Sequence, residues 1–287
     1  MNKAETLELL REKQHRVETT RIKRYKPYPY QSKFHNDGEE CRQRILMAAN
    51  RVGKTYCGAA ETAYHLTGEY PSWWEGRRFD KAVRVWVAGE SNDTTRDIIQ
   101  RELFGAPQDP QMKGTGAIPL KNIAETIRKP GVPNAYSAAL VRHASGRNSH
   151  ISFKAYEQGF EKFMGEAVDV IWLDEEPKQE IFSQCITRTA DTSGVVYMTF
   201  TPEKGMTNVV SAFLNDLKLG QSVSTATWED VDHLDEKTKK QLLSVYSPAE
   251  REMRSKGIPV FGSGLIYPVV EDDIICEDFD LPRHYPV

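Results

Sequence analysis

Ile45-Leu46-Met47-Ala48-Ala49-Asn50-Arg51-Val52-Gly53-Lys54-Thr55-Tyr56 is the stretch that decides the fold of this chain. An apolar run, predicted as a strand over 43–49, leads into a loop that ends in Gly-Lys-Thr, and a helical pattern follows over 54–66. This order is typical of a phosphate-binding loop, in which backbone N–H groups and the positive end of the next helix face an anion. Lys54 would reach the outer phosphates and the Thr55 hydroxyl would bind Mg²⁺. The template has glycine where this chain has Ala48, and Gly-Lys-Thr alone also occurs in ordinary loops.

A second motif, Asp169-Val170-Ile171-Trp172-Leu173-Asp174-Glu175-Glu176-Pro177, follows about 120 residues later. An apolar strand ends there in acidic residues, and its apolarity fits a strand buried on both faces of a parallel sheet. Phosphate-loop enzymes have their second metal contact at this place. By that pattern Asp174 would hold Mg²⁺ through water, and Glu175 would polarise the attacking water as the general base. The alternative is a strand that ends in an exposed acidic turn. The two motifs, with strand and helix patterns alternating between them, together predict an NTPase.

The fold class expected from these patterns is α/β. It is a P-loop NTPase of the additional-strand, catalytic-glutamate type, with a central, mostly parallel sheet flanked by helices and a small lid subdomain. Further strands are predicted over 82–88, 150–156, 195–202 and near 222–228, and helices over 3–18, 92–104, 235–246, 248–256 and near 207–216. We also expect a turn packed on the domain at 28–34, an aromatic loop at 68–79 and a long surface excursion over 105–135.

Composition limits the class of protein. The 287 residues, 39% hydrophobic and 28% charged, are typical of a soluble protein with one large domain, or a domain plus a small attachment. No apolar run approaches the ~20 residues that cross a bilayer, and the charged N-terminus lacks a signal-peptide core, so we expect a cytosolic protein. The four cysteines are scattered and the seven histidines lack metal-ligand spacing, which favours reduced thiols over disulfides or a metal site built by the protein alone.

Basic residues are concentrated in residues 1–33, although the net charge of the whole chain is −3. A basic arm can bind nucleic acid, but a solvated helix face is the commoner explanation. The overall charge argues against tight, non-specific DNA binding by this chain alone.

Three further segments carry candidate functional side chains. The Gln31 amide can both donate and accept, as the N6 and N7 edge of adenine requires, although a surface glutamine is the ordinary alternative. Trp73 and Trp74 could stack on a nucleobase, but packing against the domain is the favoured interpretation. Thr199 and Thr201 place hydroxyls at the carboxyl end of a strand, where they could sense the γ-phosphate or its water. Threonine is also simply a good strand residue.

With these motifs the chain resembles the large terminase subunit, the DNA-packaging motor of tailed bacteriophages, and most closely that of headful-packaging, short-tailed phages of enteric bacteria. The likeness extends from about Tyr28 over nearly the whole chain. Its segments are Met47-Ala48-Ala49-Asn50-Arg51-Val52-Gly53-Lys54-Thr55, Phe79, Gly89-Glu90, Ile118-Pro119, Tyr156-Glu157-Gln158-Gly159, Trp172-Leu173-Asp174-Glu175-Glu176-Pro177, Thr187-Arg188-Thr189, Thr199-Phe200-Thr201-Pro202, Gly257-Ile258-Pro259 and Gly262-Ser263-Gly264. In this family a phosphate loop without an initial glycine is usual, which accounts for Ala48.

The resemblance implies ATP and Mg²⁺ as ligands and assigns roles residue by residue. The candidate catalytic residues are Glu175 as the base, Lys54, Arg51 and Arg188. ATP would be bound by Tyr28, Gln31 at the adenine-reading position, Ala48, Ala49, Asn50, Arg51, Val52, Gly53, Lys54 and Thr55. Thr55 and, through water, Asp174 would hold Mg²⁺, while Thr199 and Thr201 match the motif that couples hydrolysis to DNA movement. Many terminases have an arginine near the phosphates where Arg51 lies, whereas some close relatives have an uncharged residue there.

One position departs from the family pattern. Several terminases have an Arg-Gly upstream of the acidic strand, whose arginine reaches the site of the neighbouring subunit, but Met164-Gly165 stands here. Arg188, on the helix expected after the acidic strand, and Arg147 are the candidates for a trans-acting arginine, with Arg188 first. A surface salt bridge is the alternative for both.

The expected organisation is a basic helical arm at 1–24, an ATPase core at 25–228, a lid at 229–262 and a linker at 263–287 towards an absent nuclease domain. Nuclease activity is therefore not expected. The resemblance implies double-stranded DNA, a ring of subunits on the capsid portal and the small terminase subunit as partners, with no membrane. It also implies the cytoplasm of an infected bacterium rather than the mature virion. The alternatives are a helicase-like, nucleic-acid-stimulated ATPase and a non-hydrolysing, nucleotide-binding assembly module.

Overall fold

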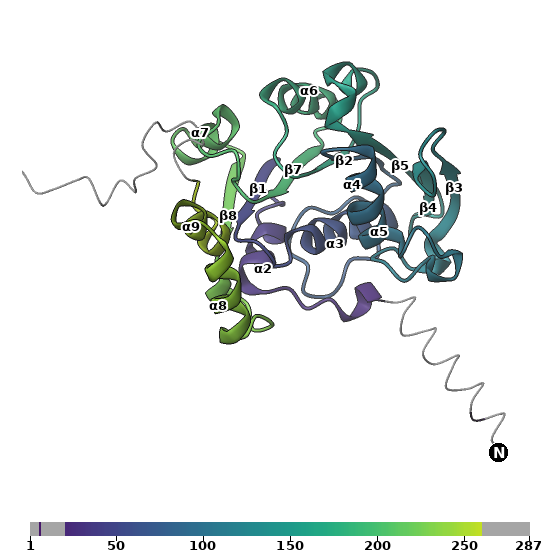
Figure 1. The fold of residues 1–287 in the computed structure, drawn as a ribbon. Coiled ribbons are helices and arrows are strands. Elements are labelled where there is room, and N and C mark those ends of the chain that lie inside the picture. The colour runs from purple at the N-terminus through teal and green to yellow at the C-terminus, as the bar shows by residue number, and fades with distance from the viewer. Residues whose placement is uncertain (1–5, 7–20, 260–287) are drawn as a thin grey trace, which may run out of the picture.

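An eight-stranded sheet forms the centre of the computed structural model, which describes residue 6 and residues 21–259 (Figure 1). The strands lie in the order β3-β4-β5-β2-β6-β7-β1-β8. Their bounds are β1 (Gln43–Ala48), β2 (Arg84–Gly89), β3 (Ile123–Arg128), β4 (Tyr136–Arg142), β5 (Asn148–Ala155), β6 (Val170–Asp174), β7 (Val195–Phe200) and β8 (Gln221–Ala226).

The strands from β5 to β8 in this order run parallel, whereas β4 is antiparallel to β5 and β3 is antiparallel to β4. β6 and β7 are buried along their whole length, as expected where helices cover both faces of a parallel sheet. β7 lies between β1 and β6, so one additional strand separates the strand before the Gly-Lys-Thr loop from the acidic strand. This order confirms the predicted additional-strand type of P-loop fold.

Helices cover the two faces of the sheet (Figure 1). α3 (Lys54–Thr67) packs on one face, and α6 (Gln179–Ala190) and α7 (Asn208–Leu214) pack on the other. Leu46 and Ala48 of β1 join the core on the α3 side, while Ile45 and Met47 join the core on the other side. This alternation is the two-residue period of a strand with two buried faces. Gly58 of α3 has no room for a side chain next to Trp172 of β6, so the helix lies close against the sheet.

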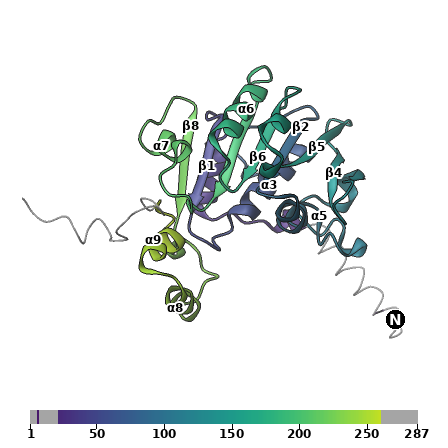
Figure 2. The same cartoon turned by 45° about the horizontal axis from the view of Figure 1, so that its top comes forward.

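Of the other helices, some pack with α3 on its face of the sheet and some lie beyond β8 (Figure 1). They are α2 (Pro29–Asn36), α4 (Asn92–Thr94), α5 (Arg101–Phe104), α8 (Glu236–Val245) and α9 (Pro248–Lys256), with a π-helical stretch, Thr95–Gln100, joining α4 to α5. Figure 2 shows α8 and α9 together beyond one end of β8, away from the helices that cover the sheet. These two helices make up most of the described part of the segment predicted as a lid. Among the helices that the structure describes, none has the length and apolar character to cross a membrane.

The prediction of a long surface excursion over 105–135 was wrong. This segment contains β3 at the edge of the sheet, and Ala117 and Ile118 are fully buried. The following strand β4 was also missed. β3 shows mostly polar or exposed side chains after Ile123, because an edge strand with one solvated face needs little apolar surface. Its sequence therefore lacks the apolar run that identified the central strands.

Two smaller predictions also need correction. Residues 28–34 were expected to form a turn, but α2 begins at Pro29, where a fixed φ and a missing N–H suit the first position of a helix. The helix expected over 92–104 is present, but its middle turns are π-helical. The helix expected over 3–18 lies outside the described residues, apart from Thr6, which is helical, and the linker expected over 263–287 lies entirely outside them.

Candidate active site

The peptide carbonyls from Ala48 to Gly53 all face a side-chain hydrogen-bond donor. Across a planar peptide, the C=O of one residue and the N–H of the next point in opposite directions. Each donor holds a carbonyl on the outside of the loop, so the following N–H group points to the inside of the loop. The carbonyl and donor pairs are Ala48 with Thr201 (3.1 Å), Ala49 with Lys54 (2.6 Å), Asn50 with Trp228 (2.8 Å), Arg51 with His233 (2.8 Å), Val52 with Tyr30, and Gly53 with Gln31 (3.1 Å).

The backbone N–H groups of residues 51–53 donate no hydrogen bond of ordinary length and angle to another backbone group in the described residues, and those of Lys54 and Thr55 lie in the first turn of α3, where a helix supplies no partner. Arg51 and Gly53 are both in the left-handed region, with φ of 63° and 83°. Glycine adopts this conformation freely, whereas a residue with a side chain is strained there by about 1–2 kcal/mol. Consecutive inward N–H groups that lead into the first turn of a helix form a concave site for an anion such as phosphate. The loop from Ala48 to Lys54 has this geometry and is called the P-loop below.

Lys54 is only 8% exposed and is held by two oxygen atoms. Its Nζ donates to the Ala49 carbonyl at 2.6 Å and to the Thr201 hydroxyl at 2.7 Å. Burial lowers the pKa of Lys54 to about 8, and the negative charges of Glu175, Asp174 and Glu203 oppose this shift. The side chain is therefore largely charged at neutral pH, beside the free N–H groups of the P-loop.

Asp174, at the end of β6, lies between two threonine hydroxyls. Thr199 on the adjacent strand β7 donates to its Oδ1 at 2.7 Å, and the Thr55 hydroxyl lies 3.2 Å from Oδ1 and 3.3 Å from Oδ2. The Trp172 indole in turn donates to Thr199 at 2.8 Å, which fixes that hydroxyl. Burial raises the pKa of Asp174 to about 6, while the hydrogen bonds from Thr199 and Thr55 and the charge of Lys54 lower it. Asp174 is thus mostly ionised at neutral pH.

The Thr55 and Asp174 oxygens fit a magnesium ion. Adjacent ligands of an octahedral Mg²⁺ lie about 3 Å apart, and Mg²⁺ prefers a few carboxylate or hydroxyl oxygens together with phosphate and water. The 3.2 Å between the Thr55 hydroxyl and Asp174 Oδ1 suits this arrangement. Within the described residues, no group of three His, Cys, Asp or Glu side chains gathers to hold a metal. The protein offers two ligands here, and phosphate and water would have to complete the shell.

Glu175 follows the strand directly and has a left-handed backbone, with φ of 65°. The Glu175 N–H donates to the Thr199 carbonyl at 2.9 Å, and the Tyr156 hydroxyl donates to the Glu175 carbonyl at 2.9 Å. These contacts hold a strained residue at the carboxyl end of the sheet. Although its side chain is partly exposed, loss of water contact and then the charge of Asp174 raise the pKa of Glu175 to about 7, against the opposing charge of Lys54. A carboxylate with this pKa can act as a base near neutral pH.

Gln31 lies against the P-loop but is engaged on both sides of its amide. Its Oε1 accepts from the Tyr28 N–H at 3.0 Å and from the Tyr25 hydroxyl at 3.2 Å, and its Nε2 donates to the Gly53 carbonyl at 3.1 Å. The side chain is only 2% exposed. In this structure Gln31 braces the P-loop, and its adenine-reading role stays a prediction.

Sequence reasoning missed three side chains that hold the loop: Tyr30, Trp228 and His233. Tyr30 lies in α2 and stacks on Tyr28 with ring centroids 5.8 Å apart, whereas Trp228 and His233 follow β8. His233 donates from Nε2 to the Arg51 carbonyl, which leaves Nδ1 to accept from the Tyr28 hydroxyl at 3.1 Å. The aromatic pattern Tyr28-x-Tyr30 was the available signal for Tyr30. Trp228 and His233 carried none, because they reach the loop only through the sheet order.

The arginine candidates lie at different places. Arg51 is exposed on the P-loop itself. Arg188, in the last turn of α6, donates to the Gly165 carbonyl at 2.5 Å, and its own carbonyl accepts from Val168 before β6 begins. Arg147 is exposed just before β5. Arg188 and Arg147 therefore lie at the edge of the sheet where the parallel strands begin, opposite Glu175, and neither contacts this chain's own site.

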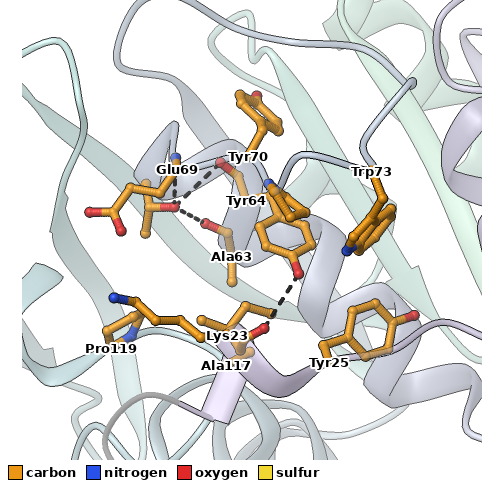
Figure 3. A pocket seen from close by; sticks show the side chains of 12 residues that line it. Lys23, Tyr25, Ala63, Tyr64, Glu69, Tyr70, Trp73, Ala117 and Pro119 are labelled. Atoms are coloured by element: carbon orange, nitrogen blue, oxygen red, sulfur yellow. Dashed lines mark hydrogen bonds between the residues drawn. The ribbon is translucent and has the colours of Figure 1, made fainter.

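A pocket of about 310 Å³ lies at the other end of α3 (Figure 3). Ala63, Tyr64 and Thr67 of α3 line it, between about 13 and 20 Å along the helix from Lys54 at 1.5 Å per residue. Tyr25, Tyr70 and Trp73 add aromatic walls. Trp73 and Trp74 pack with Tyr64 and His35, so the favoured interpretation of packing against the domain agrees with these contacts.

Known proteins resemble this chain in sequence. The family model "Terminase large subunit, T4likevirus-type, N-terminal" matches residues 45–271. The large terminase subunit of Salmonella phage P22 is 36% identical over 300 residues, which cover 99% of this chain and 60% of that protein. That of Enterobacteria phage LP7 is 25% identical, over 99% of this chain and 62% of that protein. The chain thus spans about 60% of the length of these relatives.

Solved structures resemble the fold. The large terminase ATPase domain of Thermus phage P74-26 has a TM-score of 0.58 and 14% identity, over 82% of this chain and 95% of that one. A large terminase from a thermophilic bacteriophage, solved in complex with ADP, has a TM-score of 0.56 and 13% identity, over 81% of this chain and 52% of that one. At these identities the likeness concerns the fold. Because the family model matches well over half of its residues, the chain belongs to the terminase large subunit family.

Proposed function

We propose that the chain is the ATPase part of a genome-packaging motor, which hydrolyses ATP to move viral double-stranded DNA into a procapsid. The observation that carries the proposal is the pair of contacts joining Lys54 to Thr201 and Thr55 to Asp174. They bring the P-loop, the acidic strand and the additional strand into one site. Membership in the family supports the packaging role, and the solved relative with bound ADP supports an adenine nucleotide as ligand.

The residues have distinct tasks in this proposal. The triphosphate would lie against the N–H groups of residues 51–55, with Lys54 beside its outer phosphates. Thr55 and Asp174 would hold Mg²⁺, which when bound offsets phosphate charge. Glu175 would orient a water molecule in line with the γ-phosphorus and take up its proton. Thr201 is hydrogen-bonded to Lys54, so the loss of the phosphate would change this contact and move the loop after β7.

Further parts of the motor follow from the family. We propose that full-length subunits form a ring on the capsid portal, contact duplex DNA and work with the small terminase subunit in the cytoplasm of the infected cell. An arginine that acts in the active site of a neighbouring subunit cannot face the active site of its own subunit. Arg188 lies at the edge of the sheet opposite Glu175, and this position supports it as the trans-acting arginine. The segment 229–262 would act as the lid that moves with the nucleotide state.

A phosphate-release assay with and without duplex DNA tests the proposal. We expect Lys54→Ala and Glu175→Ala to lower ATP turnover by about 10²-fold or more, since each removes a group that acts on the transferring phosphate. The matched controls are Lys81→Ala, just before β2, and Glu125→Ala, on the edge strand β3, both exposed and away from the site, and both should keep the wild-type rate. Near-wild-type turnover by either site variant would refute the site.

The same assay, read beside strand-separation and ATP-binding measurements, separates the alternatives. Strand separation coupled to hydrolysis would favour a helicase-like ATPase, and tight ATP binding with no hydrolysis in an assembled ring would favour a nucleotide-binding assembly module. An absence of ATP binding by the wild type would refute all three.

A further inference from the structure

The last turn of α9 rests directly on the P-loop. The Asn50 N–H donates to the Arg254 carbonyl at 2.9 Å. Three residues later, Gly257 ends the helix with φ of 70°, and a Cβ there would lie 2.6 Å from the Ala48 carbonyl carbon. Only glycine fits such a contact without moving the backbone. The position of Arg254 is therefore fixed relative to the loop that would hold the phosphates.

The Arg254 side chain points from α9 towards the loop after β7. Its Nη1 lies 2.9 Å from Glu203 Oε1, and its Nη2 lies 3.4 Å from Glu250 on the same helix. The guanidinium also lies over the Tyr246 ring, 5.1 Å from its centroid. The Nε is buried and has no hydrogen-bond partner in the described part of the chain. Arg254 thus keeps an unused donor while Glu203 holds its outer end.

Glu203 is joined to the catalytic groups. Its N–H donates to the Thr201 carbonyl at 2.7 Å in a tight turn, and the Thr201 hydroxyl accepts from Lys54. The charge of Glu203 also acts on Lys54 and Glu175, whose pKa values it helps to raise. A terminal phosphate beside Lys54 would bring further negative charge close to Glu203. Like charges repel, so the phosphate would weaken the hold of Glu203 on its arginine.

We propose that Arg254 recognises the γ-phosphate of ATP from the lid, and that Glu203 holds its guanidinium beside the site until that phosphate arrives. ATP and Glu203 then compete for one cation, whereas ADP leaves the ion pair intact. The backbone bond between Asn50 and Arg254 carries the change from α9 to the P-loop. This inference rests on the proposed ATPase function.

The test measures equilibrium binding of ATPγS and of ADP, each with Mg²⁺, to the whole chain by calorimetry. Arg254→Ala should weaken ATPγS binding about tenfold and ADP binding less than about twofold, since it removes a charged hydrogen-bond donor to the γ-phosphate alone. Glu203→Gln should strengthen ATPγS binding about threefold and leave ADP binding unchanged, because it removes the competing charge. Opposite effects from the two members of one ion pair distinguish recognition from a structural salt bridge.

Two variants control for damage to the lid. Arg254→Lys keeps the charge and should retain part of the preference for ATPγS. Arg251→Ala removes an exposed arginine of the same helix that does not contact Glu203, and it should bind both nucleotides as the wild type does. If Arg254→Ala and Glu203→Gln leave the ratio of the two affinities unchanged, the inference is wrong while the proposed function stands. If the wild type binds neither nucleotide, the proposed function fails and the inference fails with it.

Discussion

The Nζ of Lys54 donates a 2.7 Å hydrogen bond to the hydroxyl of Thr201, a residue 147 positions further along the chain. This bond joins the first turn of α3 to the loop after β7, across the end of β1. The Thr201 hydroxyl also lies 2.6 Å from the Asn50 side-chain oxygen. A phosphate that draws Lys54 towards itself would therefore change the contacts of Thr201, which gives hydrolysis a direct route to the loop that carries Glu203.

We expect Thr201→Val to lower ATP turnover by about 10- to 100-fold, because a hydrogen bond to a charged group is worth about 1.5–3 kcal/mol and its loss leaves Lys54 misplaced. Thr201→Ser keeps the hydroxyl and should stay within a fewfold of the wild type. Single-turnover phosphate release measures both. A Thr201→Val variant as fast as the wild type would show that this contact has no part in turnover.

The pKa of Glu175, raised to about 7, predicts the pH dependence of catalysis. A general base works only in its ionised form, so kcat/KM should rise with pH and level off above about 7. The ordinary glutamate pKa would place this rise near 4 to 5. The check is a kcat/KM profile from pH 5 to 9 with saturating Mg²⁺. A profile that is flat between pH 5.5 and 8 would contradict Glu175 as the base.

The same shift affects stability, with a sign that can be tested. A carboxyl whose folded-state pKa lies above its unfolded value binds more protons when folded, so it lowers the free energy of unfolding as pH rises from about 4.5 to 7. Glu175→Gln has no carboxyl at this position, so it removes this loss of stability at high pH. The gain in stability of Glu175→Gln over the wild type should therefore be larger at pH 8 than at pH 5, by urea denaturation without nucleotide or Mg²⁺. An equal difference at both pH values would argue against the raised pKa.

Gln31→Ala separates bracing of the P-loop from reading of adenine. Because the amide bonds Gly53, Tyr28 and Tyr25, we expect Gln31→Ala to weaken ATP and GTP binding by a similar factor, of about 5 to 20. Competition binding of the two nucleotides measures this. If ATP affinity falls while GTP affinity is unchanged, Gln31 reads adenine as the sequence analysis predicted.

The central site was predictable because its signals are local. Gly53, Lys54 and Thr55 stand together in the sequence, and so do Asp174 and Glu175. Once β1 and β6 are recognised as buried parallel strands, their carboxyl ends must meet at one edge of the sheet. The additional strand followed in the same way, since Thr199 and Thr201 end a third apolar run.

Other features could not be read from local pattern. β3 was missed because an edge strand with a solvated face has few apolar residues. Trp228, His233 and Arg254 of α9 reach the P-loop only because β8 pairs with β1, and no motif encodes that pairing. The position of Arg188 depends on the direction of α6, which the sequence does not give. α6 runs back about 18 Å over its 12 residues, so its last turn lies at the edge of the sheet opposite Glu175.

A crystal structure with a non-hydrolysable ATP analogue and Mg²⁺ tests the central claim most directly. The account predicts the β- and γ-phosphates against the N–H groups of residues 51–55 and Lys54 Nζ, the ion beside Thr55 and Asp174, and Glu175 facing a water in line with the γ-phosphorus. A nucleotide bound elsewhere, for example in the aromatic pocket at the far end of α3, with the P-loop unchanged, would contradict it.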